Sequence, residues 1–138
     1  MNAEKVLITS TGLFAGVALG VSLSGVPTIA ISQRPKDTWE KLYVTGRNTV
    51  VPLLLTTAVA GSMVYSRTKN PKILATTIIG AFPLPFTVLV MGSNVKTLQS
   101  SSNADPRVPE LAATWAKLHW VRTVAGITSF GLAVYTLM

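Results

Sequence analysis

The stretch Trp115-Ala-Lys-Leu-His-Trp-Val-Arg122 opens the last apolar segment of the chain, residues 112–137, and contains its only histidine, His119. At about 3.6 residues per turn, Trp115, His119 and Arg122 fall on one face of a helix. Lipid does not tolerate histidine and arginine on an exposed face, so this face is expected to point inward, at protein or a polar cavity. Any chemistry that the protein performs is expected there.

The composition indicates an integral membrane protein with a single domain, residues 1–138. Of these residues 49% are hydrophobic and 12% are charged, whereas about 25% are charged in a typical soluble domain. The net charge of +7 comes from basic residues at the ends of apolar stretches, which favours juxtamembrane charge over nucleic-acid binding. Cysteine is absent, which excludes disulfides, iron–sulfur clusters and thiolate metal ligands.

Four apolar stretches predict four transmembrane helices. They lie at about residues 6–26, 38–66, 73–95 and 110–137. Because the connections are short, we expect an all-α, up-down-up-down, four-helix transmembrane bundle. Residues 27–36 are expected to form a loop, with Asp37 as the N-cap of the second helix. Pro83 and Pro85 each remove a backbone donor, which predicts a kink in the third helix.

This topology brings the ends of the first and third helices to the same side as the starts of the second and fourth. Polar and aromatic residues concentrate there: Trp39, Tyr43, Arg47, Asn48, Asn94, Trp115, Lys117, His119, Trp120 and Arg122. A polar, aromatic pocket open to that side is therefore expected. Two alternatives stay open, in which Trp39 belongs to an interfacial aromatic belt and Asn94 simply ends its helix.

The pocket residues favour acid–base chemistry over metal chemistry. One histidine, no cysteine and no acidic residue inside a span cannot build a usual zinc or iron site, and haem with a single axial histidine is a less favoured alternative. A neutral His119 can act as a general base, while Arg47 and Arg122 can stabilise an anion formed from a flat aromatic substrate. In the competing interpretation, His119 and Arg122 hydrogen-bond neighbouring helices and only hold the bundle together.

Three groups of residues resemble a known family. They are Trp39-x3-Tyr43-x2-Gly46 with Pro52 beyond it, Asn94 at the end of the third helix, and Trp115-x3-His119-x2-Arg122. Together with four spans in a short chain, this pattern resembles the anthrone-oxygenase-like integral membrane proteins, known from fungal aromatic polyketide pathways, over nearly the whole chain. The resemblance implies oxidation of an anthrone to an anthraquinone by molecular oxygen, without a metal or flavin cofactor.

The resemblance also implies roles for individual residues. His119 would be the base, Arg122 and Arg47 would stabilise the anthrolate or peroxide, and Asn94 would supply a hydrogen bond. The pocket lining would come from Trp39, Tyr43, Asn48, Trp115 and Trp120, although helical geometry puts Trp120 about 100° away from His119. The implied partners are a hydrophobic aromatic molecule, O₂ and the lipid bilayer.

The competing class is a non-catalytic small subunit or assembly factor of a larger membrane complex. Small residues recur every four positions along the first helix, at Gly12, Gly16, Gly20 and Ser24, and suit close packing against another helix in this chain or a partner. A homo-oligomer is compatible with either class. In a eukaryotic cell, the endoplasmic reticulum and the mitochondrial inner membrane are both candidate locations.

Overall fold

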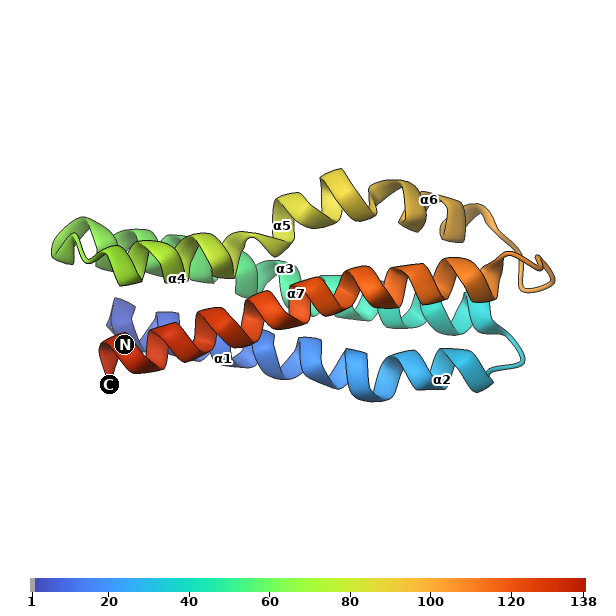
Figure 1. Ribbon diagram of the computed structural model, residues 1–138, viewed down its shortest axis with the longest axis horizontal. Coiled ribbons are helices and arrows are strands. Elements are labelled where there is room, and N and C mark those ends of the chain that lie inside the picture. The colour runs from blue at the N-terminus through green and yellow to red at the C-terminus, as the bar shows by residue number, and fades with distance from the viewer. Residues whose placement is uncertain (1) are drawn as a thin grey trace.

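The structure, a computed structural model, describes residues 2–138 as four helical arms that run antiparallel to one another (Figure 1). The first arm joins α1, a π-helical segment η1 and α2; the third joins α4, α5, a second π-helical segment η2 and α6; α3 and α7 form the second and fourth. In chain order the bounds are α1 Ala3–Gly20, η1 Val21–Gly25, α2 Val26–Ile31, α3 Pro35–Thr68, α4 Pro71–Ala81, α5 Pro83–Phe86, η2 Thr87–Met91, α6 Gly92–Ser100 and α7 Val108–Leu137. The predicted all-α, four-helix fold class is confirmed.

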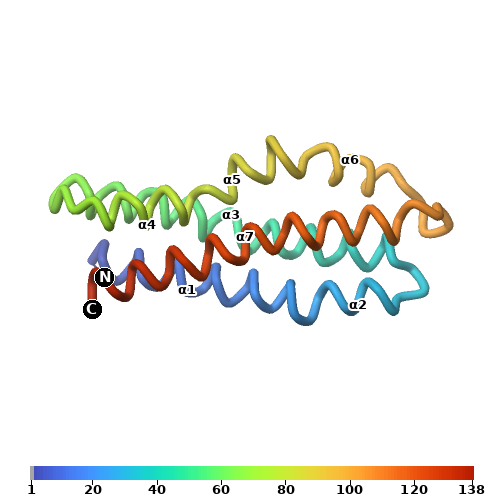
Figure 2. The backbone as a smooth tube through the Cα atoms, viewed as in Figure 1, coloured from blue at the N-terminus to red at the C-terminus, as the bar shows by residue number. Residues whose placement is uncertain are grey.

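Each arm packs against two neighbours. Both α3 and α7 pack against α1 and α4, so the four arms occupy the corners of a square. The two chain termini and the α3–α4 turn lie at one end, while residues 32–34 and 101–107 form the loops at the other end (Figure 2). This arrangement is the up-down-up-down order that the sequence predicts.

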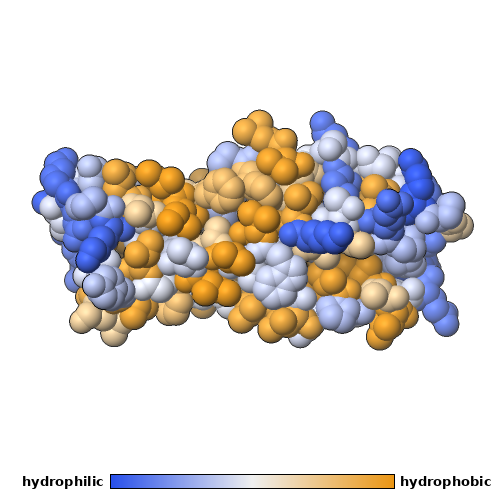
Figure 3. Space-filling view, viewed as in Figure 1, coloured by the Kyte–Doolittle hydropathy of each residue, from blue (hydrophilic) through white to orange (hydrophobic). Residues whose placement is uncertain are grey.

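The surface of the bundle matches a lipid environment. Three arms, Ala3–Ile31, Pro35–Thr68 and Pro71–Ser100, are long and apolar enough to cross a membrane by length and composition. Hydrophilic side chains gather at both ends and apolar side chains cover much of the middle (Figure 3). The fourth arm, α7, has 30 residues and carries the histidine of the chain. These features are consistent with an integral membrane protein.

The first two predicted helix boundaries need correction. Residues 27–36 do not form a loop throughout, because the first arm stays helical to Ile31. Pro27 lies inside this arm, and the π-helical segment just before it supplies the altered hydrogen-bond pattern that a proline in a helix requires. Asp37 is not an N-cap: Pro35 occupies the first turn and Arg34 takes the cap position, as the fixed φ of proline favours.

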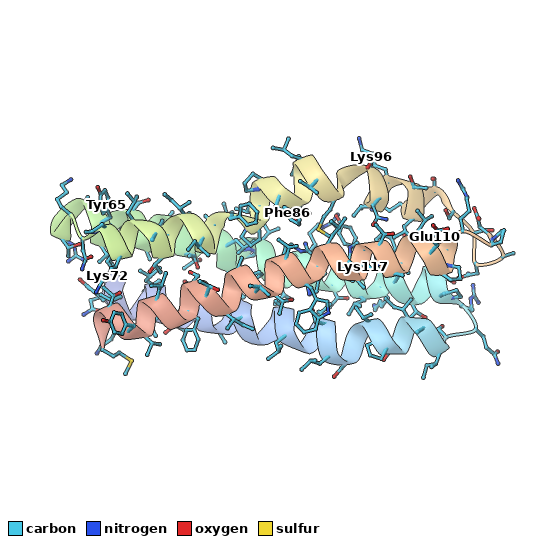
Figure 4. All side chains as sticks on the ribbon, in the orientation of Figure 1. Tyr65, Lys72, Phe86, Lys96, Glu110 and Lys117 are labelled. Atoms are coloured by element: carbon cyan, nitrogen blue, oxygen red, sulfur yellow. The ribbon has the colours of Figure 1, made fainter. Side chains whose placement is uncertain are left out.

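The kink predicted in the third arm is confirmed. Helix α4 ends at Ala81, and Pro83 begins the short helix α5. Beyond this break the arm swings away from the line of α4 (Figure 1), and α6 packs mainly on α7. Phe86 marks the break and Lys96 lies beyond it, whereas Tyr65 and Lys72 lie at the opposite end (Figure 4). We call the part between the break and the chain termini the terminal half, and the part between the break and the two loops the loop half.

Close contacts through small residues hold the terminal half together. A Cβ atom added at Gly80 would lie 2.6 Å from Ser129 Oγ and 2.8 Å from Thr57 Cγ2, and one added at Gly61 would overlap the Thr77 side chain. A hydrogen bond of 2.8 Å joins the hydroxyls of Ser10 and Thr57. Glycine thus permits the helix-to-helix distance that these contacts need.

The predicted small-residue stripe of the first helix is only partly used. Gly12 faces Phe130, with 2.9 Å from an added Cβ to the ring, whereas Gly16 and Gly20 have open space in front of them. The inter-helix contacts of α1 within this chain therefore involve Gly12 but not the next two glycines.

Candidate functional site

A cavity of about 200 Å³ lies in the loop half, directly beside the proline break. Segments of all four arms form its wall: α1 with η1, α3, α5 with η2, and α7. Most of the lining is apolar. Five of the residues predicted for the site line it, namely Tyr43, Arg47, Trp115, His119 and Arg122.

His119 is buried, and both of its ring nitrogens have partners. Its Nδ1 lies 2.6 Å from Arg122 Nη2, and its Nε2 lies 3.0 Å from the carbonyl oxygen of Ala18. An arginine can only donate, so Nδ1 accepts and Nε2 carries the proton that is donated to Ala18. The contacts therefore define a neutral imidazole whose single lone pair, on Nδ1, is covered by Arg122.

Arg122 is held without an acidic partner. Its Nη1 donates to Thr87 Oγ1 at 3.0 Å, and its guanidinium carbon lies 5.8 Å from the centre of the Trp115 ring. Its Nε is buried and has no hydrogen-bond partner. Within residues 2–138, the ion pairs involve Arg34, Lys36, Arg67 and Arg107, and none involves Arg122. No aspartate or glutamate lines the cavity. The cavity therefore contains a positive charge with an unused donor.

The two π-helical segments place the backbone and hydroxyl groups that hold this pair. Helix η1 follows Ala18 after two residues, and η2 begins at Thr87. A π-helical turn shifts backbone hydrogen bonds by one residue, and such turns often occur at functional sites. The Ala18 carbonyl accepts from His119, and Thr87 donates to the Pro83 carbonyl at 2.7 Å while it accepts from Arg122. The irregular helices thus fix both ends of the His119–Arg122 pair.

Aromatic rings form the wall of the cavity that faces the loops. The ring of Trp115 stacks on His119 at 5.2 Å, with an angle of 9° between the planes. Trp39 stacks on Tyr43 at 5.1 Å and meets Trp115 edge-on at 6.2 Å. Because Trp39 is completely buried behind Tyr43, it supports the lining rather than forming it. Arg47 lies over the Tyr43 ring at 5.7 Å.

Besides Trp39, the residues expected at the pocket that lie outside the cavity are Asn48, Asn94, Lys117 and Trp120. The amide nitrogen of Asn94 donates to the Leu111 carbonyl at 3.1 Å, so this side chain ties α6 to α7. Asn48 is exposed and Trp120 is 40% exposed; neither lines the cavity. For Trp120 the reason is the angular offset of adjacent residues on a helix.

The opening of the cavity also differs from the prediction. The expected pocket opened towards the loops, but the packed core around Trp39 and Trp115 closes that side. Sequence reasoning missed Thr87 and the Ala18 carbonyl. A threonine four residues after a proline was the available signal for Thr87, because a helix-breaking proline leaves room for side-chain hydrogen bonds.

The surroundings of His119 bear on the metal and haem alternatives. Within residues 2–138, no three histidine, cysteine, aspartate or glutamate side chains lie close enough together to hold a metal ion. Both nitrogens of His119 are engaged with protein groups, so this histidine does not present a free nitrogen to an iron atom.

Fold and site together define a small, all-helical, membrane-type bundle with a buried cationic cavity lined by aromatic and aliphatic side chains. The anthrone oxygenase family matches residues 39–132. This match covers more than half of the chain, and the chain belongs to the anthrone oxygenase family. No curated protein and no solved structure matches it. Membership of this family supports an oxygenase-type function and does not favour the small-subunit interpretation.

Proposed function

We propose that this protein is a membrane-embedded oxygenase that converts an anthrone-type aromatic polyketide to a quinone with O₂. The observation that carries the proposal is the buried His119–Arg122 pair, which adjoins a cavity without a carboxylate to neutralise it. An acidic aromatic substrate would supply the missing negative charge when it ionises. Family membership supports the reaction class.

The first step is removal of a proton from the methylene carbon between the two outer rings of the anthrone. His119 Nδ1 is the basic atom, but it accepts from Arg122 in the structure. When the substrate oxygen accepts the Arg122 hydrogen bond instead, Nδ1 becomes free to take the proton. Substrate binding and base activation are thus one event, and general-base catalysis of this kind contributes about 10²–10⁴ in rate.

The second step is reaction of the anthrolate with oxygen. The negative charge lies largely on the anthrolate oxygen, where Arg122 stabilises it and Arg47 at the cavity mouth assists. Attack of the carbanion carbon on O₂ gives a peroxide anion, which takes back the proton held on His119 and so regenerates the base. Loss of water from the hydroperoxide then forms the second carbonyl, so that anthrone and O₂ yield quinone and H₂O.

The proposal needs no bound cofactor, because the electron-rich anthrolate itself reduces oxygen. The partners are then the lipid bilayer, a hydrophobic aromatic molecule and O₂. In a eukaryotic cell the location would be the endoplasmic reticulum or the mitochondrial inner membrane.

The test is quinone formation by protein purified in mild detergent. Emodin anthrone is supplied in air, and the absorbance of the quinone is followed against a protein-free control, since anthrones oxidise slowly unaided. We expect a rate well above this control, reduced about 10²–10⁴-fold in His119→Ala. A wild-type rate equal to the control would overturn the oxygenase.

A second variant separates the base from a purely structural histidine. His119→Asn retains an oxygen that can accept from Arg122 but cannot take up the substrate proton. We expect His119→Asn to be as inactive as His119→Ala but to unfold at a higher temperature than His119→Ala, because it keeps an acceptor for Arg122. Full activity in His119→Asn would remove the base assignment and leave the histidine as a support for Arg122.

A further inference from the structure

The cavity beside Arg122 is closed towards both ends of the bundle. Towards the loops, buried side chains of all four arms pack together; they are Ile29, Trp39, Met91, Val95, Leu98, Val108, Ala112 and Trp115. Towards the termini, Phe14 packs closely on Gly126, and Thr57 and Ser129 pack closely on Gly80, so that all four arms are in contact there. Within the described residues, access along the bundle axis from water is therefore blocked by packed side chains.

The side of the bundle between α3 and η2 is different. The exposed residues among those that line the cavity are Arg47 on α3 and Val88 on η2, and Val88 is 74% exposed. Gly46, next to Arg47, also lines the cavity, and a Cβ atom added there would meet nothing within 4 Å. The proline break moves the third arm out of line with α4 (Figure 1), and Val88 stands just beyond this break.

This side opening lies at the level of the lipid chains. Val88 belongs to an uncharged stretch, residues 73–95, and Val50 and Val51 on the opposite wall belong to another, residues 48–66. Each of these two uncharged stretches is close to the length of about 20 residues that a helix needs to span the hydrocarbon core of a bilayer. Arg47 lies one residue outside the second stretch, where a long basic side chain reaches the membrane surface.

We propose that the cavity opens sideways into the lipid bilayer between α3 and η2, and that its ligand enters from the lipid. The ligand class follows from the path: a flat polycyclic aromatic molecule that dissolves in the bilayer and carries one anionic oxygen. Apolar walls at Val50, Val51 and Val88 accept the rings, and the anionic oxygen passes from Arg47 to Arg122. The class of ligand rests on the proposed function, whereas the position of the opening rests on the packing.

The test blocks the opening reversibly in protein reconstituted into nanodiscs. The chain has no cysteine, so Val88→Cys gives a unique thiol that benzyl methanethiosulfonate converts to a mixed disulfide. The matched control is Ile78→Cys on α4, which is 61% exposed and does not line the cavity. Both variants carry Trp120→Phe, which leaves the buried Trp39 and Trp115 as energy donors. The probe is anthracene-9-carboxylate, and the readout is the rate of the saturable rise in its emission on tryptophan excitation.

We expect the benzyl group on the Val88→Cys protein to slow uptake of the probe at least about tenfold, the equivalent of about 1.4 kcal/mol in the barrier, and dithiothreitol to restore the rate. The same label on the Ile78→Cys protein leaves uptake unchanged. Uptake that is equally fast in labelled and unlabelled Val88→Cys protein would overturn the lateral opening. The probe is not oxidised, so its uptake is measured independently of the quinone assay with emodin anthrone. Slowed uptake in labelled Val88→Cys protein, together with no quinone formation by the wild type, would support the opening and overturn the oxygenase. Unslowed uptake together with quinone formation would overturn the opening alone.

Discussion

The terminal half of the bundle is packed around glycines, whereas the loop half is packed around aromatic rings and keeps a cavity. In the terminal half, hydroxyl groups find partners across helices, as Ser129 Oγ does with the Thr76 carbonyl at 2.8 Å. In the loop half, four buried polar atoms have no partner, on Trp39, Asn94, Trp115 and Arg122. In the terminal half, Thr136 Oγ1 is buried without a hydrogen-bond partner.

This difference separates a structural from a functional use of the same four arms. Buried polar groups without partners cost free energy and are retained mainly where they have a role. The proline break marks the border between the two halves, since it ends the close α3–α4 contact and creates the cavity. We therefore expect changes in the loop half to affect activity, and changes in the terminal half to affect stability.

Among the changes that compare the two halves, the largest expected effect is on activity, from Arg122→Met. Removal of the charge that stabilises the anthrolate should lower the initial rate of quinone formation by about 10²–10³, while the similar length of methionine preserves the packing. The matched control is Arg67→Met, because Arg67 lies at the terminal end in a surface ion pair with Glu4. Equal rates in the two variants would contradict the division between the halves.

The largest expected effect on stability comes from Gly80→Val. The added side chain has to displace Ser129 and Thr57, and overpacking of this kind costs about 1–3 kcal/mol. Gly131→Val is the control, because an added Cβ at Gly131 meets nothing within 4 Å. The thermal unfolding midpoint in detergent should fall clearly for Gly80→Val only. A fall of the same size in both would contradict the assignment of the loss to overpacking against Ser129 and Thr57.

A smaller effect on activity is expected from Thr87→Val. This change keeps the shape of the side chain but removes the hydroxyl that accepts from Arg122 Nη1. A hydrogen bond to a charged group contributes about 1.5–3 kcal/mol, so the rate of quinone formation should fall about tenfold or more. Thr87→Ser should restore most of the rate. Failure of serine to do so would mean that Thr87 acts through packing alone.

The smallest effect is expected in the loop of residues 101–107. Hydrogen bonds from Arg107 hold the pKa of Asp105 below its usual value of 3.8. A carboxyl with a lowered pKa in the folded state adds stability above its unfolded-state pKa and loses it as the pH falls through the folded value. Asp105→Asn should therefore lower the unfolding midpoint slightly at about pH 7 and not at all at about pH 2. A difference that persists at the lower pH would rule out this ionic origin.

The sequence was sufficient to predict the all-α bundle and the core of the candidate site. Charge-free stretches mark the arms, and helical spacing places Trp115, His119 and Arg122 on one face, as the structure has them. Helical periodicity could not indicate that the first arm passes through Pro27, because a π-helical turn has no simple residue signature.

At the site, the sequence could not predict which side chains face the cavity, because this depends on how the helices pack. Asn94 and Trp120 lie in the same half of the bundle as His119, but the position of a residue along a helix does not decide the direction in which its side chain points. The role of Thr87 depends on the break in the third arm, and the direction of the opening depends on how far that break moves η2 from α3. Both are properties of tertiary packing.

The most direct test of the division between the halves is the rise in unfolding midpoint that a ligand produces. Anthracene-9-carboxylate is added to wild type, Arg122→Met and Gly80→Val at about a hundred times its dissociation constant, where binding adds about 2.7 kcal/mol of stability. We expect equal rises in wild type and in Gly80→Val, which starts from a lower midpoint, and no rise in Arg122→Met. A full rise in Arg122→Met would contradict this expectation, because the anion would then bind elsewhere.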